Sequence, residues 1–349
     1  MNVLSSPLKR IAGRTSRRLS DLGVLSKGMF QYYTAGAVTP EARRLVLDRY
    51  CQSNGLFTEK LAAVLRMVRP ARRAAPTQGL LGSYSVEEQK KIAESIRRDG
   101  FHVFERRLPT EICDQIESLA RVTPTVVHGH SKDRNDRFIF DPSRPLGKKY
   151  SVPESEIVAN PAMQQLMGDS AILAIAESYL QTLPMLGDVT LWWSAVHPGD
   201  QDNDAGQNFH FDFDTPPRWL MFFIYLTDVD TETGPHMYVR GSHRANIPAA
   251  ADLRSRGYVR IPDGDVTAAL GQDKVVELHG KRGTVLAVDT MGFHKGKPLI
   301  AGHRLMGQLI YSYAHFTGAH QARVALPENP HPVLAKAVAE NPRVYWKFR

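Results

Sequence analysis

The stretch QNFHFDFDTPPRWLMFFIYL, residues 207–226, places one histidine and two aspartates among phenylalanines, directly ahead of an apolar run. Polar groups beside a buried strand are costly unless they are paired or bind a metal. Residues i and i+2 of a strand project to the same face. The pattern therefore predicts a strand in which His210 and Asp212 face one metal ion, while Phe211 and Phe213 pack the other way.

Two protein ligands do not fix an ion, so a third is expected from a neighbouring strand. His294 ends the strand-like stretch GTVLAVDTMGFH, 84 residues downstream of His210. Two histidines and one carboxylate leave coordination positions open and suit non-haem Fe(II) oxygenases. We therefore interpret His210, Asp212 and His294 as a metal-binding triad.

Arg304 follows ten residues later, at the start of the apolar strand RLMGQLIYSY. A guanidinium beside a hydrophobic strand needs an anion, and it binds a carboxylate bidentately. We interpret that anion as the distal carboxylate of a dicarboxylate co-substrate chelating the same iron. The structural alternative is an Asp or Glu of the chain in a buried ion pair.

From residue 188 onward, short apolar strands are separated by turn signals, which favours a barrel or a two-sheet jelly roll over a βαβ fold. The predicted strands are 189–196, 207–213, 218–229, 235–239, 274–278, 283–289 and 304–316.

Helical patterns occupy the first half and the tail of the chain. Residues 41–68 have helical spacing, and 69–83 resemble a linker rich in Pro, Gly and Arg. The next expected elements are a helix from Ser85 to Gly100, a strand at 101–108, a helix capped by Thr110, a helical stretch at 161–180 and a tail helix near 332–340.

Charge is concentrated near the N-terminus. The chain has a net charge of +8, and residues 1–80 contain fourteen Lys or Arg against four acids. This segment is expected either to be a solvated, partly helical appendage or to touch an anionic membrane or an acidic partner; nucleic acid is not favoured. Its first twenty residues lack acids, as transit peptides do, but there is no clear apolar signal core, which argues against secretion.

Two cysteines without a CxxC pair suit a reducing compartment and exclude a disulfide scaffold or a thiolate zinc site. No apolar run approaches the length of a membrane span. We expect a cytoplasmic protein, with peripheral membrane contact as the variant that the basic segment suggests.

Five ordered segments resemble the phytanoyl-CoA dioxygenase-like family of Fe(II)/2-oxoglutarate-dependent oxygenases, and the resemblance covers about residues 86–320. The segments are RRDGFHVFERRLPTEICDQIESL, NPAMQQLMGDSAILAIAESYL, QNFHFDFD, FFIYLTDVDTETGPHMYVRGSH and GTVLAVDTMGFHKGKPLIAGHR. The resemblance implies a double-stranded β-helix, iron on the triad, Arg304 on the C5 carboxylate of 2-oxoglutarate, and Gln207 near the ligands. It also implies O2-dependent hydroxylation with release of succinate and CO2.

Several site details stay open within this resemblance. Many family members have a serine two residues after the distal histidine, where this chain has Gly296. The second contact to the co-substrate is therefore undecided, with Trp192, Thr284 and Gln308 as candidates. An acid at position 212 argues against halogenation, because related halogenases have a small residue there.

Other polar residues have simpler interpretations. Asp214 is expected near the ligands or the substrate without binding the metal, and His236 and His243 are expected to be structural. His128 and His130 belong to a polar segment, 127–150, that forms either a wall of the substrate site or a plain surface loop. Trp192 and Trp193 should point to opposite faces, and the tail residues Tyr345 and Trp346 should serve packing or oligomer contacts.

The predicted organisation is a jelly-roll, cupin-like dioxygenase domain at 84–325, flanked by a basic, largely helical extension at 1–83 and a tail at 326–349. The predicted substrate is an organic small molecule or a carrier- or envelope-linked group. The alternatives are a cupin-type isomerase, lyase or co-substrate-independent dioxygenase, or a non-catalytic binding protein that acts through its basic extension.

Overall fold

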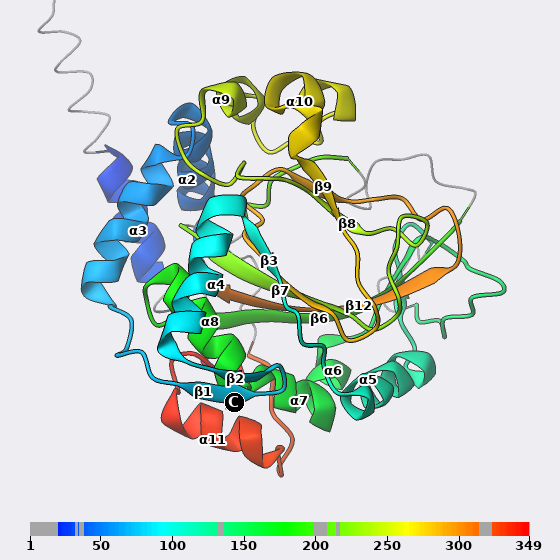
Figure 1. The fold of residues 1–349 in the computed structure, drawn as a ribbon. Coiled ribbons are helices and arrows are strands. Elements are labelled where there is room, and N and C mark those ends of the chain that lie inside the picture. The colour runs from blue at the N-terminus through cyan, green and yellow to red at the C-terminus, as the bar shows by residue number, and fades with distance from the viewer. Residues whose placement is uncertain are drawn as a thin grey trace, which may run out of the picture.

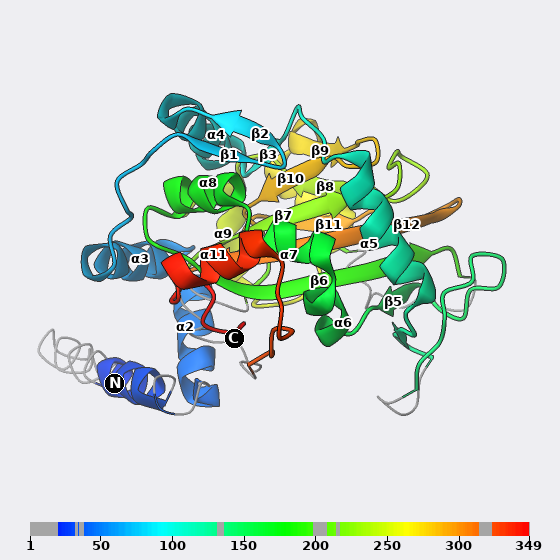
Figure 2. The ribbon, with the colours of Figure 1, turned by 90° about the horizontal axis from the view of Figure 1, so that it is seen from below.

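The fold is known from a computed structural model that describes residues 20–31, 34, 38–130, 136–197, 208–213, 217–313 and 323–348. It has three layers: a layer of helices, a large antiparallel sheet and a smaller antiparallel sheet (Figures 1 and 2).

The large sheet has seven strands in the order β3-β10-β7-β12-β6-β5-β4. Their bounds are β3 Phe101–Val103, β4 Val126–Val127, β5 Lys149–Ser151, β6 Met185–Ala195, β7 Trp219–Tyr225, β10 Val285–Val288 and β12 His303–Ser312.

The small sheet has the order β11-β8-β9, with β8 at His236–Val239, β9 at Val275–Leu278 and β11 at His294–Gly296. The chain passes from β7 in the large sheet to β8 and β9 in the small one. It returns for β10, crosses again for β11 and returns for β12. This alternation between two facing sheets is the predicted double-stranded β-helix, or jelly roll.

Most helices lie on the outer face of the large sheet, as Figure 2 shows, while α9 and α10 lie beyond the small sheet in Figure 1. The helix bounds are α2 Pro40–Gln52, α3 Leu56–Val68, α4 Val86–Asp99, α5 Thr110–Val122, α6 Glu154–Ala159, α7 Pro161–Met167, α8 Ser170–Leu180, α9 Pro248–Ser255, α10 Asp263–Leu270 and α11 Pro332–Glu340; a short 3-10 helix, η2, covers Gln272–Lys274.

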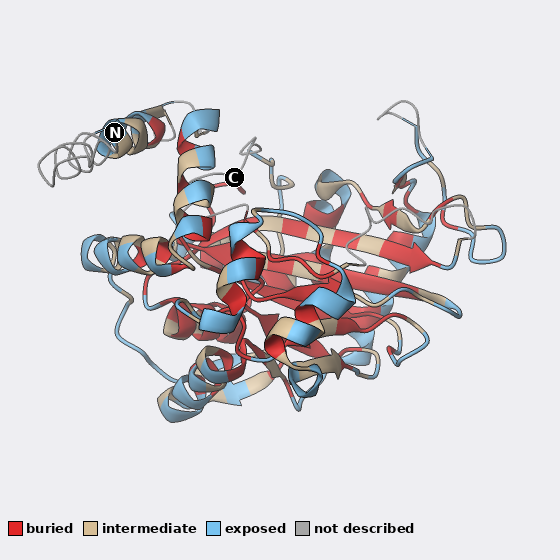
Figure 3. Ribbon diagram, turned by 90° about the horizontal axis from the view of Figure 1, so that it is seen from above, coloured by how far each residue is buried: buried red, intermediate tan, exposed pale blue. Residues whose placement is uncertain are grey.

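Strand alternation divides the interior into two cores. On β7, Leu220, Phe222 and Ile224 face the helices, whereas Met221 and Phe223 face the small sheet. Successive strand residues point to opposite faces, and both faces of the large sheet are covered, so β7 and β10 are buried throughout and β6 and β12 over most of their length (Figure 3).

Local signals place helix α4 as predicted. The Ser85 side chain accepts from the Glu88 amide and the Glu88 side chain accepts from the Ser85 amide, which is a capping box. Gly100 ends the helix with a φ of 93°, a conformation that costs glycine little. The predicted tail helix at 332–340 is also confirmed.

Several predicted elements were wrong in extent. Residues 41–68 form two helices, because the chain turns at Asn54 and Gly55 with positive φ. The stretch 161–180 likewise divides into α7 and α8, and Asp169 caps the second of them. The strand at 101–108 stops at Val103, and Thr110 is the first residue of α5 rather than its cap.

Other corrections concern loops. Part of the predicted linker is a hairpin of β1, Thr77–Gly79, and β2, Gly82–Tyr84. Of the predicted strand 207–213, the described residues 208–213 form only isolated bridges, Phe209 with Ile261 and His210 with His294. Helices α9 and α10 were not predicted at all.

The basic N-terminal region contacts the β-sandwich. Glu59 of α3 pairs with Arg218, and the Asn54 side chain donates to the Ile247 carbonyl at 2.7 Å. Within the described residues, no helix is both long enough and apolar enough to cross a bilayer.

Candidate metal centre

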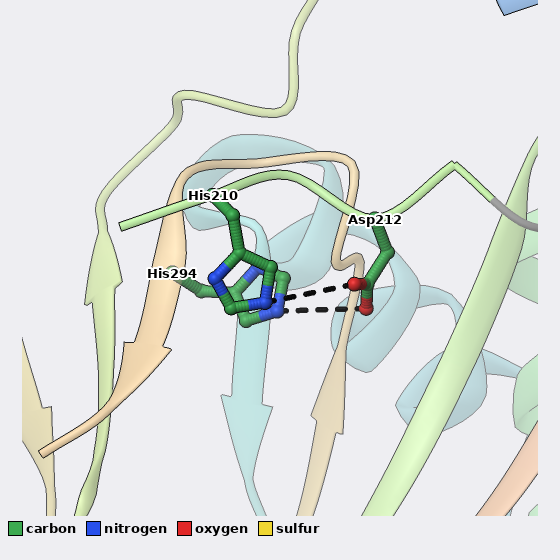
Figure 4. A group of neighbouring side chains, drawn as sticks. All are labelled: His210, Asp212 and His294. Carbon is green, nitrogen blue, oxygen red and sulfur yellow. Dashed lines mark ion pairs between the residues drawn. The ribbon is translucent and has the colours of Figure 1, made fainter. Parts of the chain in front are cut away.

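The three predicted ligands converge at one place. Nε2 of His210 lies 3.7 Å from one carboxylate oxygen of Asp212, and Nε2 of His294 lies 3.5 Å from the other (Figure 4). One potential ligand atom from each residue lies within 4.8 Å of the other two. These distances suit a single ion held between them.

Hydrogen bonds from the imidazoles to backbone carbonyl groups set the orientation of both histidine rings. Nδ1 of His210 lies 2.8 Å from the Asn208 carbonyl, and Nδ1 of His294 lies 2.9 Å from the Gly292 carbonyl. A carbonyl only accepts, so each Nδ1 carries the proton and each Nε2 presents a lone pair toward Asp212. This tautomer is the one that a metal binds through Nε2.

Segment 208–213 is held at the edge of the small sheet. The backbones of His210 and His294 exchange two hydrogen bonds of 3.0 and 2.8 Å, and the Asp212 amide donates to the Thr290 carbonyl at 2.8 Å. The Trp219 indole in turn donates to the Thr290 hydroxyl at 2.7 Å. The two ligand-bearing segments are therefore tied together by their main chains.

The surroundings of His210 and Asp212 favour the neutral imidazole and the ionised carboxylate, which are the forms that bind a metal. Burial, helped by the neighbouring His294, lowers the pKa of His210 to about 3, so its imidazole is neutral. Burial would raise the pKa of Asp212, but His294 and His210 outweigh it and hold the pKa of this carboxyl well below its usual range. Two imidazoles and a carboxylate are a donor set that fits a divalent transition metal.

Arg304 lies in the same cavity without an anionic partner. Its side chain is buried; one nitrogen is 3.4 Å from the Ser194 hydroxyl, and Nε and one Nη are buried without a hydrogen-bond partner among the described residues. No described carboxylate pairs with it, so the predicted alternative of a buried ion pair within the chain finds no support there. A buried arginine that lacks an anion fits a carboxylate ligand.

Strand register places two cations beside one hydroxyl. Ser194 of β6 is the cross-strand partner of both Arg304 in β12 and Lys149 in β5. The Lys149 ammonium lies 5.0 Å from the centre of the Trp192 ring. Burial and the neighbouring Arg304 lower the pKa of Lys149. Lys149 and Arg304 therefore form a positively charged part of the cavity lining, which we call the positive wall.

The cavity has a volume of about 650 Å³ and is lined by the triad, Arg304 and residues of both sheets. Trp192 and Gln308, two candidates for the second co-substrate contact, line it. Thr284 does not; its carbonyl accepts from the Tyr225 amide at 2.9 Å. The polar segment 127–150 contributes His128 and Lys149 to the wall.

Other predicted residues lie elsewhere. Trp193 is fully buried on the helix side of the sheet and its indole donates to the Ala120 carbonyl, so the two tryptophans do face opposite ways. His243 is structural, with Nε2 3.1 Å from the Arg97 carbonyl, and Tyr345 is packed in the first core. Gln207 and Asp214 lie outside the described residues.

Two neighbours of the site were missed as functional candidates. His236, expected to be merely structural, lines the cavity and stacks on His294 with ring centres 5.2 Å apart. Lys149 was not singled out. No local pattern marks either residue, because each reaches the site through strand register.

A third missed residue comes from the N-terminal region. The Tyr50 ring of α2 lies 5.2 Å from Phe211 and 4.9 Å from Phe213, the two residues that flank Asp212. Its hydroxyl donates to the Met291 carbonyl at 3.3 Å, three residues before His294. The first helices therefore support both ligand segments.

Comparison with solved structures finds proteins of low sequence identity. HygX from Streptomyces hygroscopicus, with nickel and 2-oxoglutarate bound, is 18% identical, with 68% of this chain and 90% of that chain covered and a TM-score of 0.46. EctD from S. alaskensis with bound Fe is 19% identical, covers 77% and 94%, and has a TM-score of 0.45. The epimerase SnoN from nogalamycin biosynthesis is 18% identical, covers 64% and 82%, and has a TM-score of 0.45.

These similarities are too distant to carry an argument about chemistry, and no curated protein sequence matches the chain. The sequence profile described as Phytanoyl-CoA dioxygenase (PhyH) does match, over residues 96–304. That range includes β3 to β11, all three converging side chains and Arg304. By this match the chain belongs to the phytanoyl-CoA dioxygenase family.

Proposed function

We propose that this protein is an Fe(II)- and 2-oxoglutarate-dependent oxygenase that hydroxylates an organic small molecule or a carrier- or envelope-linked group. The observation that carries the proposal is the joint arrangement, around one cavity, of the triad and a buried Arg304 that has no anionic partner among the described residues. The triad fits a divalent metal, and Arg304 fits the carboxylate of a keto acid that lies farthest from that metal.

In this proposal His210, Asp212 and His294 hold the iron through two Nε2 atoms and a carboxylate oxygen. With iron bound, oxidative decarboxylation of 2-oxoglutarate by O2 would supply the oxidant and release succinate and CO2. Arg304 orients the co-substrate through its C5 carboxylate, which a guanidinium grips with two parallel hydrogen bonds.

The other side chains that line the cavity determine its shape and exclude water from it. Met221, Phe223 and Met306 present apolar surface to the cavity and limit the water beside the metal. Lys149 belongs to the positive wall with Arg304, and its ammonium lies over the Trp192 ring; Lys149 and Trp192 would contact the co-substrate or the substrate. Excluding water strengthens the electrostatic contacts made inside.

The test is anaerobic titration of the full-length protein with Fe(II) and then 2-oxoglutarate, monitored by the weak visible charge-transfer band of the chelate. We expect a saturable band that is absent from His210→Ala and Asp212→Ala. An exposed control, Asp228→Ala, should behave as the wild type. Metal binding without any 2-oxoglutarate response would favour a cupin-type enzyme that needs no co-substrate.

Turnover is the second test. Candidate substrates are screened by their stimulation of succinate formation, with hydroxylated product identified by mass spectrometry. Succinate formed together with an epimerised or cyclised product would retain the co-substrate chemistry but refute hydroxylation. No succinate with any metal-competent preparation would refute the oxygenase proposal.

The N-terminal helices suggest a peripheral contact with an anionic bilayer. The apolar residues Leu56, Val64 and Met67 recur at helical spacing on the solvent side of α3, with Lys60 on the same side, and Val64 and Met67 are 50% and 75% exposed. An apolar stripe next to strongly basic sequence is typical of helices that bind membrane surfaces. We propose that this face touches anionic lipid in the cytoplasm.

Cosedimentation with vesicles of phosphatidylcholine, with and without phosphatidylserine, tests this contact. We expect binding only to the anionic vesicles, weakened by added salt and reduced in Met67→Asp. Val122→Asp is the matched control, because Val122 is 72% exposed on α5. Equal binding by both variants, or a concentration-dependent dimer abolished by Met67→Asp, would overturn the membrane proposal.

A further inference from the structure

His236 occupies a position in the metal cavity that the triad and Arg304 leave unexplained. It is the first residue of β8, and its cross-strand partner in β11 is Gly296, two residues after His294. Residues paired across a sheet share a face, so His236 and His294 project to the same side. The two imidazoles stack nearly parallel, at an interplanar angle of 17°.

The polar atoms of this imidazole are not all satisfied. His236 is only 4% exposed, and its Nε2 is buried without a hydrogen-bond partner among the described residues. Gly296, directly opposite, has no side chain to offer one. Buried polar groups in native proteins are nearly always hydrogen-bonded, so an orphan of this kind calls for a missing partner.

Arg304 contributes a second set of buried polar atoms that have no hydrogen-bond partner among the described residues. Nε and one Nη of Arg304 are also buried without partners within the described part of the chain, and both residues line the cavity. His236 therefore stacks on His294 and lines the same cavity as Arg304.

A ligand that satisfies both groups must present several acceptor oxygens between the metal and the guanidinium. We propose that His236 donates a hydrogen bond from its imidazole to a carboxylate oxygen of the bound 2-oxoglutarate and is a second co-substrate-binding residue. This inference rests on the proposed function, because it requires the co-substrate to reach from the metal to Arg304.

Binding measured without turnover tests it. The full-length protein is loaded anaerobically with Fe(II), or with Co(II), and titrated with 2-oxoglutarate by calorimetry and by the charge-transfer band. His236→Leu should weaken 2-oxoglutarate binding roughly 10- to 100-fold, the range expected for one hydrogen bond to a charged group. His236→Gln retains a donor and should recover most of the affinity. Metal affinity should change little in either variant.

Two further variants sharpen the result. His303→Leu is a matched control, because His303 precedes Arg304 on β12 but makes an edge-to-face contact with Trp193 at the opposite face of the sheet. It should leave 2-oxoglutarate affinity unchanged. Adding Gly296→Ser to His236→Leu places a hydroxyl on the facing strand and should restore part of the lost affinity.

Unchanged 2-oxoglutarate affinity in both His236 variants would overturn the inference. A raised KM for the primary substrate with unchanged co-substrate affinity would also overturn it and assign the imidazole to the substrate instead. Failure of the wild-type, metal-loaded protein to bind 2-oxoglutarate would refute the proposed function itself, which is a separate and distinguishable outcome.

Discussion

Replacing Tyr50 with leucine should weaken the metal site as well as the fold. The Tyr50 ring packs on Phe211 and Phe213, and its hydroxyl binds the Met291 carbonyl. The described residues around Asp212 are held by isolated bridges and single backbone hydrogen bonds rather than by a continuous ladder. The position of this segment therefore depends on these side-chain contacts as well.

The magnitude follows from the two losses. Truncating a fully buried ring and leaving a partly filled cavity costs about 1–3 kcal/mol, and loss of the hydroxyl's hydrogen bond costs about 1 kcal/mol more. We expect the free energy of unfolding of the metal-free protein to fall by roughly 2–4 kcal/mol. Disturbing groups that orient metal ligands typically lowers metal affinity about 10- to 100-fold.

Denaturant unfolding with and without Co(II), a redox-stable substitute for Fe(II), separates the two effects. A metal present at about 100 times its Kd stabilises the folded state by about 2.7 kcal/mol, and a tenfold weaker site loses about 1.3 kcal/mol of that increment. The increment should therefore be smaller in Tyr50→Leu than in the wild type.

Tyr345→Leu is the matched control. Tyr345 is also fully buried and donates one hydrogen bond, to the Met167 carbonyl at 2.8 Å, but it packs in the core on the helix side of the large sheet. It should lose comparable stability and keep the full metal-dependent increment. Equal increments in Tyr50→Leu and wild type would refute the reasoning and leave Tyr50 with a purely structural role.

Three further predictions follow from single contacts. Arg304→Gln should raise the Kd for 2-oxoglutarate by about two orders of magnitude, since a buried charged pair is lost, with unchanged metal affinity by calorimetry. Burial would raise the pKa of Glu277, but hydrogen bonds from Lys297 and His279 lower it to about 2; its stabilisation is therefore present above the ordinary pKa of about 4.5 and lost as pH falls through 2. Glu277→Gln should accordingly be less stable than wild type at pH 6 and equal to it near pH 2 in unfolding experiments. Ser85→Ala should cost about 1 kcal/mol of stability by removing the cap of α4, and an unchanged denaturation midpoint would contradict this.

The sequence predicted the architecture well where a local signal was strong. Strand patterns identified β3, β6, β7, β10 and β12 of the large sheet, although β4 and β5 were not predicted, and Ser85 and Gly100 marked the ends of a helix. Element boundaries failed where a single residue changed the backbone, as at Gly55 and Asp169. The prediction of a strand around His210 was wrong, because its described residues form single β-bridges to distant segments instead of a continuous strand pairing.

The residues of the site also divide into those that could be recognised in the sequence and those that could not. The spacing of His210 and Asp212 is local, so it was visible before any fold was known. His294 and Arg304 were selected because each lies at an end of a strand-like apolar stretch, and the family resemblance then implied the same two residues. The roles of Lys149 and His236 were not visible, since they depend on which residues of β5, β6, β8 and β11 stand opposite one another.

By itself, the sequence determined the jelly-roll class, the two-histidine, one-carboxylate donor set and the basic character of the N-terminal region. Only the tertiary structure decided that Tyr50 supports the ligand segments, that Lys149 and Arg304 flank Ser194, and that His236 enters the cavity. The reason is physical: periodicity and residue chemistry are properties of short stretches, whereas strand register and helix docking depend on contacts between residues far apart in the chain.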